Sequence, residues 1–152
     1  VLVVDVDGVL SDASSRQYLL GVEPRRWADF FEASLDDPAI PEGIGLARAL
    51  VGFTDDTGSF GARPLVLLTA RPARLVDTTM AWMARHGVGW DLLVMRVDGD
   101  NRTSPDVKRE ALTDLRATGH EPALAVDDDP RNAEMYWSEG VPVVYVHSGY
   151  YD

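Results

Sequence analysis

The stretch VLVVDVDGVL, residues 1–10, decides the fold. It begins with four apolar residues, and two acids, Asp5 and Asp7, follow with Gly8 directly after them. A strand buried on both faces stays apolar, whereas a strand with one exposed face alternates along its length. This stretch does neither, because its acids come together where the apolar run ends. We therefore interpret residues 1–4 as a central strand with two carboxylates at its carboxyl end.

Four more Val- and Leu-rich runs follow, at residues 64–68, 91–95, 122–126 and 141–146, and helical patterns lie between them, at 72–86, 105–118 and 130–139. Buried parallel strands joined by right-handed helical crossovers give this alternation. The predicted class is α/β, with a five-stranded, mostly parallel sheet and helices on both faces. A proline stands where each helix would begin, at Pro72, Pro105 and Pro130, and Ser104 and Asp129 are the expected N-caps of two of them.

Residues 11–63 interrupt this alternation. They contain two helix-like stretches, 25–34 and 41–51, and a loop rich in Gly, Asp and Thr over residues 52–61. The segment is too long for a simple crossover loop and too short for an independent domain. We interpret it as a small helical insertion after the first strand, within a single domain that spans residues 1–152.

Composition excludes several kinds of protein. The chain has no cysteine, so disulfides and thiolate metal sites are excluded. Its formal charge of −11 disfavours non-specific binding to nucleic acid or anionic membranes, although a cation can reverse the field inside one cleft. Neither a basic signal peptide nor an apolar run of about 18 residues occurs, so we expect a cytoplasmic protein without a membrane partner. Because the sequence does not begin with Met, we also expect further domains outside it.

Polar residues follow the apolar runs at the points where ligands bind in parallel sheets, beyond the carboxyl ends of the strands. They are Asp5 and Asp7 after the first run, Thr69 and Arg71 after the second, Lys108 in the first turn of the helix after the third, and Asp127, Asp128 and Asp129 after the fourth. We expect these side chains to meet at one edge of the sheet. Asp129 is the expected helix cap among the three consecutive acids.

This set of side chains suits phosphoryl transfer. Several carboxylates close together need a hard cation, and oxygen-only ligands favour Mg²⁺. Thr69 and Lys108 offer a hydroxyl and a positive charge to phosphate oxygens. One aspartate can attack phosphorus, and a second can serve as general acid and then base. A calcium loop is excluded, since the twelfth position counted from Asp5 is Arg16 and not Glu.

In this order, DVDGVL, the Thr69-Ala70-Arg71 turn, Lys108 and Asp127-Asp128 resemble the four motifs of the haloacid-dehalogenase (HAD) superfamily of phosphatases, over essentially the whole chain. Within it, the chain is most similar to the 3′-phosphatase domain of phage-type polynucleotide kinase. The shared features are Arg16, the Thr-x-Arg turn, Asp100-x-Arg102, Glu134-Met135 and Ser148-Gly149. One departure is Ser104, which stands where the family has an acid four positions before the motif lysine; Asp106 is the nearest substitute.

The resemblance implies a Rossmann-like HAD fold and a Mg²⁺-dependent phosphomonoesterase that acts through an aspartyl-phosphate. The resemblance implies that Asp5 is the nucleophile, that Asp7 is the general acid and base, and that Thr69 and Lys108 hold the phosphoryl group. It implies that Mg²⁺ is bound by Asp5, the Asp7 backbone carbonyl and one or both of Asp127 and Asp128. It also implies that the substrate is contacted, or the acids are oriented, by Arg71, Arg16 and Arg102.

The implied substrate is a phosphorylated nucleic-acid 3′ end. No P-loop pattern occurs in the sequence, so any kinase or ligase activity would belong to a domain or partner outside this chain. Two other functions fit the same residues. One is a HAD phosphatase for nucleotides or other small molecules, and the other is a catalytically silent HAD-like interaction module.

Overall fold

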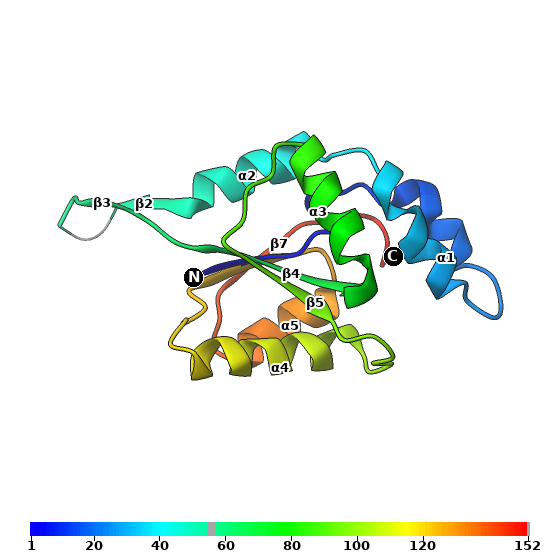
Figure 1. The fold of residues 1–152 in the computed structure, drawn as a ribbon. Coiled ribbons are helices and arrows are strands. Elements are labelled where there is room, and N and C mark those ends of the chain that lie inside the picture. The colour runs from blue at the N-terminus through cyan, green and yellow to red at the C-terminus, as the bar shows by residue number, and fades with distance from the viewer. Residues whose placement is uncertain (55–56, 152) are drawn as a thin grey trace.

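The protein is described by a computed structural model that covers residues 1–54 and 57–151. At its centre lies a five-stranded sheet with the strand order β5-β4-β1-β6-β7 (Figure 1). The strands are β1 (Leu2–Val4), β4 (Leu65–Pro72), β5 (Leu92–Arg96), β6 (Leu124–Asp127) and β7 (Val143–Tyr145). Every strand pair in this sheet is parallel. The predicted α/β class is therefore confirmed, and the first apolar run is the central strand.

Helices cover both faces of the sheet (Figure 1). One layer contains α2 (Pro41–Val51) and α3 (Val76–Arg85), and the other contains α4 (Ser104–Ala117) and α5 (Pro130–Ser138). Leu2 and Val4 pack into the first layer with Trp82, whereas Val3 packs into the second with Leu112. Because both faces of β1 are covered, its run has no polar position, and full burial of each side chain contributes about 1.5–3 kcal/mol.

The insertion after β1 contains more regular structure than the sequence indicates. It comprises η1 (Ser14–Leu19), α1 (Trp27–Glu32), η2 (Ala33–Asp36), α2 and a hairpin of β2 (Gly52–Thr54) and β3 (Phe60–Ala62). The hairpin extends from the body of the molecule in Figure 1. The loop predicted over residues 52–61 is thus wrong at its ends, where Phe53 and Phe60 favour strands; its residues 55–56 lie outside the described part.

Helix ends were predicted with mixed success. Asp129 is the N-cap of α5, and its carboxylate accepts the Arg131 backbone N–H at 2.9 Å. Pro72 does not begin a helix, because β4 continues to Pro72 and pairs there with β5. Ser104 is not a cap either. The cap of α4 is Thr103, whose hydroxyl accepts a backbone N–H of the first turn. No helix in the described part of the chain is long and apolar enough to cross a membrane.

Candidate functional site

The carboxyl ends of β1, β4 and β6 meet at one edge, and the predicted residues gather there. Asp5 follows β1, Thr69 lies in β4 and Asp127 ends β6, and all three side chains are buried. Lys108 extends from α4 to the same edge. Its Nζ lies 2.9 Å from Asp5 Oδ2 and 2.6 Å from Asp127 Oδ2. The fold therefore brings an acid from β1, an acid from β6 and a lysine from α4 into direct contact.

Lys108 is the central positive charge of this cluster, and only 1% of its surface is exposed. Burial opposes its charge, but Asp127 and Asp5 outweigh burial and hold the pKa of Lys108 well above its usual value. Burial also raises the pKa of Asp5 well above its usual range; Lys108 opposes this rise, whereas Asp127 and Asp128 add to it. The lysine thus stays an ammonium ion among carboxylates that repel one another.

Asp127 and Asp128 have different surroundings. Asp127 is fully bonded by the protein: Oδ1 accepts the Asp129 backbone N–H and the Asn132 Nδ2 group, each at 3.0 Å, and Oδ2 accepts Lys108. Both oxygens of Asp128 are buried, and in the described part of the chain neither has a hydrogen bond of normal geometry. Burial raises the pKa of Asp128 to about 7, although the nearby Ser148 hydroxyl acts in the opposite direction.

A divalent cation fits this arrangement. Carboxylate oxygens of Asp5, Asp127 and Asp128 all lie within 4.8 Å of one another. Leaving buried carboxylate oxygens without partners is costly, and a hard cation that prefers oxygen ligands would satisfy those of Asp128. Asp128 is therefore the acid that the protein leaves available to a metal, whereas Asp127 is occupied in fixing Lys108.

Gly8 makes room for Asp128. Its backbone has a φ of +82°, and a Cβ at this position would lie only 1.9 Å from Asp128 Oδ2. No side chain fits at that distance, and the left-handed conformation itself favours glycine. The glycine after the two acids thus lets the β1 loop pass directly against the unpaired carboxylate.

Two buried arginines bind Asp7. Arg16 Nη2 and Arg71 Nη2 lie 2.5 Å and 2.6 Å from Asp7 Oδ1. Burial favours the neutral acid, but Arg71 and Arg16 outweigh it and lower the pKa of Asp7 to about 2. Of the two roles expected for these arginines, their geometry matches the orienting of an acid. Thr69 supports the same group, because its hydroxyl accepts the Arg71 backbone N–H at 3.2 Å.

Asp37, in the insertion between η2 and α2, completes this network and was missed by sequence reasoning. Its carboxylate accepts Arg16 Nη2 at 2.6 Å and the Ser11 hydroxyl at 2.7 Å. No motif marks Asp37, and its partner Arg16 lies 21 residues away. Asn132 was also missed, although its place in the first turn of the helix that follows the acids is a usable signal.

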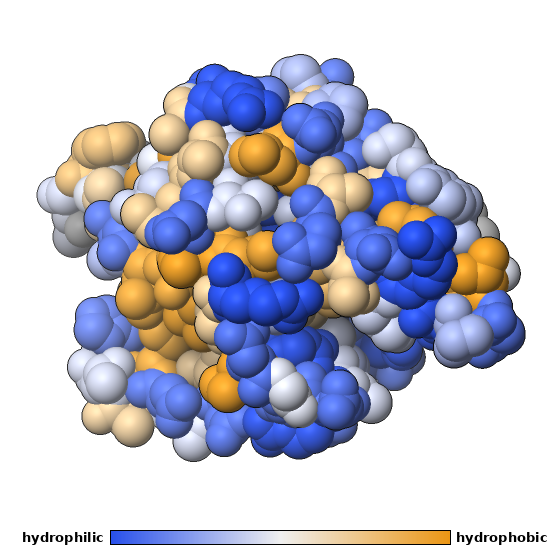
Figure 2. Space-filling view, turned by 45° about the vertical axis from the view of Figure 1, so that its right-hand side comes forward, coloured by the Kyte–Doolittle hydropathy of each residue, from blue (hydrophilic) through white to orange (hydrophobic). Residues whose placement is uncertain are grey.

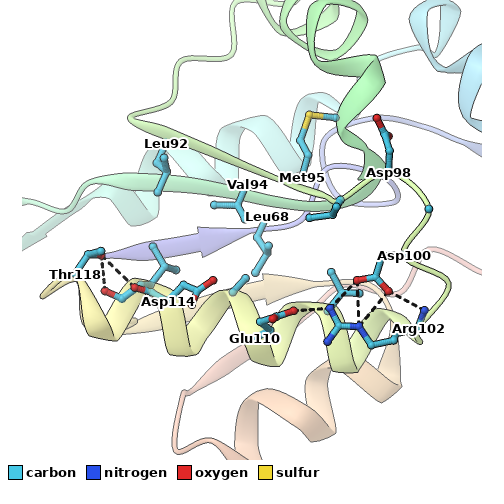
Figure 3. Close-up of a pocket in the computed structure, with 15 residues that line it drawn as sticks. Leu68, Leu92, Val94, Met95, Asp98, Asp100, Arg102, Glu110, Asp114 and Thr118 are labelled. Atoms are coloured by element: carbon cyan, nitrogen blue, oxygen red, sulfur yellow. Dashed lines mark hydrogen bonds and ion pairs between the residues drawn. The ribbon is translucent and has the colours of Figure 1, made fainter.

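Arg102 is engaged elsewhere. It binds Asp100 Oδ2 at 2.6 Å and also contacts Glu110, and its side chain is half exposed. In Figure 3 these three residues lie at one end of a groove of about 670 Å³ between β5 and α4, into which Leu68 and Val94 point. Figure 2 shows a hydrophobic hollow between hydrophilic residues on the face that it views. None of the predicted acids at the sheet edge lines the groove, and in the described part Arg102 makes no ion pair with them.

Comparison with known proteins identifies the fold. No model of a protein family matches the sequence, and no curated protein matches it. Two structures of the Pnkp1/Rnl/Hen1 RNA repair complex each contain a similar chain, with TM-scores of 0.71 and 0.72 at 20% identity. Each match covers 95% of this chain but only 41% and 45% of the other, so this chain spans less than half their length.

Smaller hydrolases match over most of their length. A haloacid dehalogenase-like hydrolase from Streptococcus pneumoniae has a TM-score of 0.60 at 14% identity, and the match covers 95% of this chain and 82% of that one. A HAD-superfamily hydrolase of subfamily IA from Geobacter sulfurreducens has a TM-score of 0.51 at 17% identity, covering 95% and 85%. With the β1, β4 and β6 ends arranged as described above, this chain has the fold of the haloacid-dehalogenase superfamily.

Proposed function

We propose that this protein is a Mg²⁺-dependent phosphomonoesterase that acts through an aspartyl-phosphate on Asp5 and removes 3′-phosphates from nucleic-acid ends. One observation carries the proposal: a buried lysine joins Asp5 to Asp127, directly beside Asp128, whose buried oxygens have no hydrogen bond of normal geometry within residues 1–54 and 57–151. Folding alone does not require such a cluster, because replacing a buried ion pair by apolar residues is often neutral or stabilising.

In the first step, an Asp5 oxygen attacks phosphorus and the bond from phosphorus to the leaving alcohol breaks, which gives the aspartyl-phosphate. Lys108, fixed by Asp127, holds the non-bridging phosphate oxygens and stabilises their growing charge, and the Thr69 hydroxyl at the same sheet edge assists it. When bound, Mg²⁺ would neutralise the crowded carboxylates and polarise the phosphoryl oxygens; Asp5, Asp128 and the Asp7 backbone carbonyl would hold it.

Asp7 has the proton-transfer role. It protonates the leaving alcohol and then takes a proton from the water that hydrolyses the aspartyl-phosphate. Arg16 and Arg71 fix its carboxylate and favour the ionised form, which is the form that accepts the proton from water. Protonation of the leaving alcohol requires Asp7 to carry a proton, which both arginines oppose in the structure as it stands.

The substrate class is supported by the fold and by particular residues. The RNA repair complex contains chains of this fold. In the sequence, Arg16 and the Thr69-Ala70-Arg71 turn resemble the corresponding features of polynucleotide 3′-phosphatases. The structure gives Arg16 and Arg71 a direct place beside Asp7. We also propose that kinase or ligase activity, where it accompanies this phosphatase, resides in a partner or further domain.

Asp5→Asn tests the chemistry. With an aryl phosphate and Mg²⁺, we expect turnover to fall by at least about 100-fold relative to the wild type, because the nucleophile is lost. The matched control is Asp114→Asn, which changes an exposed acid of α4 and should leave turnover unchanged. Equal turnover in Asp5→Asn and the wild type would refute the mechanism.

Phosphate release from oligonucleotides tests the substrate class. We expect release from a 3′-phosphorylated oligonucleotide and little from the same oligonucleotide with a 5′-phosphate. Activity confined to mononucleotides would favour the small-molecule phosphatase instead. Absence of any phosphatase activity with Mg²⁺ would leave the HAD-like interaction module as the better description.

A further inference from the structure

Residues 148–151, which follow β7, lie against the acidic cluster. The Ser148 hydroxyl lies beside Asp128, and the Tyr150 hydroxyl donates to Asp12 Oδ1 at 2.9 Å. Tyr150 also packs against the small core beneath α1, and Figure 1 shows this end of the chain beside α1. The segment 148–151 is therefore fixed at both Ser148 and Tyr150, and its position relative to the cluster is defined.

Tyr151 is the residue of this segment with a supported and partly open ring. The Arg131 guanidinium lies over the ring, 5.5 Å from its centroid. Asp129 holds Arg131 through two hydrogen bonds, Nε to Oδ1 at 3.0 Å and Nη2 to Oδ2 at 2.7 Å. Nevertheless 45% of Tyr151 is exposed. The ring thus rests on a fixed guanidinium and keeps part of its surface accessible.

Contacts through Arg131 connect the same residue to the candidate catalytic centre, because Asp129, which holds Arg131, donates its backbone N–H to Asp127 Oδ1 at 3.0 Å. Burial raises the pKa of Tyr151 above its usual value, and the negative charges of Asp128 and Asp5 add to the rise. The direction of this shift agrees with those contacts. The Tyr151 ring therefore lies over the first turn of α5, directly beside the acids that follow β6.

We propose that Tyr151 is a substrate-positioning residue, and that its ring stacks on the nucleobase of the nucleotide whose 3′-phosphate is removed. This inference rests on the proposed function and names the part of the substrate that the site recognises. Stacking on an aromatic ring is available to every base and does not depend on sequence.

The charges around Tyr151 favour a base over a second phosphate group as the partner of this surface. Arg131 is already paired with Asp129, so its positive charge is not free to attract another phosphate. The chain as a whole carries a charge of −11, which weakens contacts with a nucleic-acid backbone. An uncharged aromatic face avoids this repulsion, and we infer that stacking replaces the backbone contacts that basic nucleic-acid enzymes use.

The test compares two substrates that differ only in the base. One is a deoxynucleoside 3′-monophosphate, and the other is the corresponding base-free sugar 3-phosphate. For Tyr151→Ala we expect kcat/KM on the nucleotide to fall about tenfold or more, mainly through KM, with little change on the base-free phosphate. Tyr151→Phe retains the ring and should stay within about twofold of the wild type on both. Trp137→Ala, at an exposed aromatic residue of α5, is the control and should change neither.

Three results would overturn the inference. Equal losses on both substrates in Tyr151→Ala, with an unchanged urea midpoint, would show that the ring acts on the phosphate or the acids. No loss on either substrate would show that the ring does not contact the leaving group. If the wild type hydrolyses neither substrate nor an aryl phosphate, the proposed function itself fails and this inference fails with it.

Discussion

Replacing Gly8 by alanine should damage the proposed metal site far more than it destabilises the fold. The new Cβ would lie 1.9 Å from Asp128 Oδ2, and real Cβ contacts require about 3.0 Å, so the carboxylate must retreat by about 1 Å. Displacement of this size at a catalytic site can reduce the rate about 100-fold. The positive φ of +82° adds strain of about 1–2 kcal/mol for any residue with a Cβ.

Gly119→Ala is the matched control. Gly119 has a φ of +83°, but a Cβ there would meet no atom within 4 Å. Both variants should therefore lose about 1–2 kcal/mol of unfolding free energy through backbone strain, and Gly8→Ala should lose more because of the clash.

Three measurements separate the variants. Urea unfolding measures stability, and turnover of an aryl phosphate, together with the rise in melting temperature on adding Mg²⁺, reports on the site. We expect Gly119→Ala to keep both site readouts and Gly8→Ala to lose about 100-fold in turnover and most of the Mg²⁺ effect. If a folded Gly8→Ala protein matched Gly119→Ala in both readouts, the argument that Gly8 makes room for Asp128 would be refuted.

Three further substitutions test the ion pairs. Asp127→Asn leaves Lys108 buried with one counter-ion fewer, and urea unfolding should show a loss of about 3 kcal/mol; a loss near zero would mean that the pair contributes nothing. Asp37→Asn should cost a similar amount, about 3 kcal/mol, because buried Arg16 then has Asp7 as its one remaining carboxylate partner in the described part of the chain, and turnover of an aryl phosphate should fall as Asp7 loses its alignment; full activity would contradict this. Arg102→Ala should change KM for a 3′-phosphorylated oligonucleotide less than about twofold, since its guanidinium is already bound by acids; a tenfold rise would show that it contacts the substrate.

The sequence predicted the parallel sheet and most of the cluster because these features depend on local pattern. An apolar strand followed by Asp5 and Asp7 can be recognised within the first ten residues. That the carboxyl ends of β1, β4 and β6 meet at one edge follows from the parallel topology of the sheet. The different hydrogen-bond partners of Asp127 and Asp128 could not be predicted from local sequence pattern. They depend on whether Lys108 and Asn132 reach one acid or the other, which is decided by how α4 and α5 pack.

The insertion was the least predictable part, for a related reason. Asp37 is not part of any recognisable sequence motif, and it comes into contact with Arg16 and Ser11 only when the chain folds. Pro72 was assigned to a helix because proline commonly begins one, yet the pairing of β4 with β5 extends the strand through it. Both errors arose where tertiary contacts outweighed a local preference.

The bond between Arg16 and Asp37 also limits how this protein could exchange its insertion. Arg16 Nη2 bonds both Asp7 Oδ1 and Asp37 Oδ2, and Arg16 Nε also bonds Asp37, so part of the insertion holds a proposed catalytic acid in place. Grafting a different insertion onto this sheet, to change the size of the substrate admitted, would remove both Arg16 and Asp37 unless the graft supplied an arginine and a carboxylate at the same positions. The insertion and the candidate site are therefore a single unit for protein engineering, although the proposed chemistry would take place only in the second.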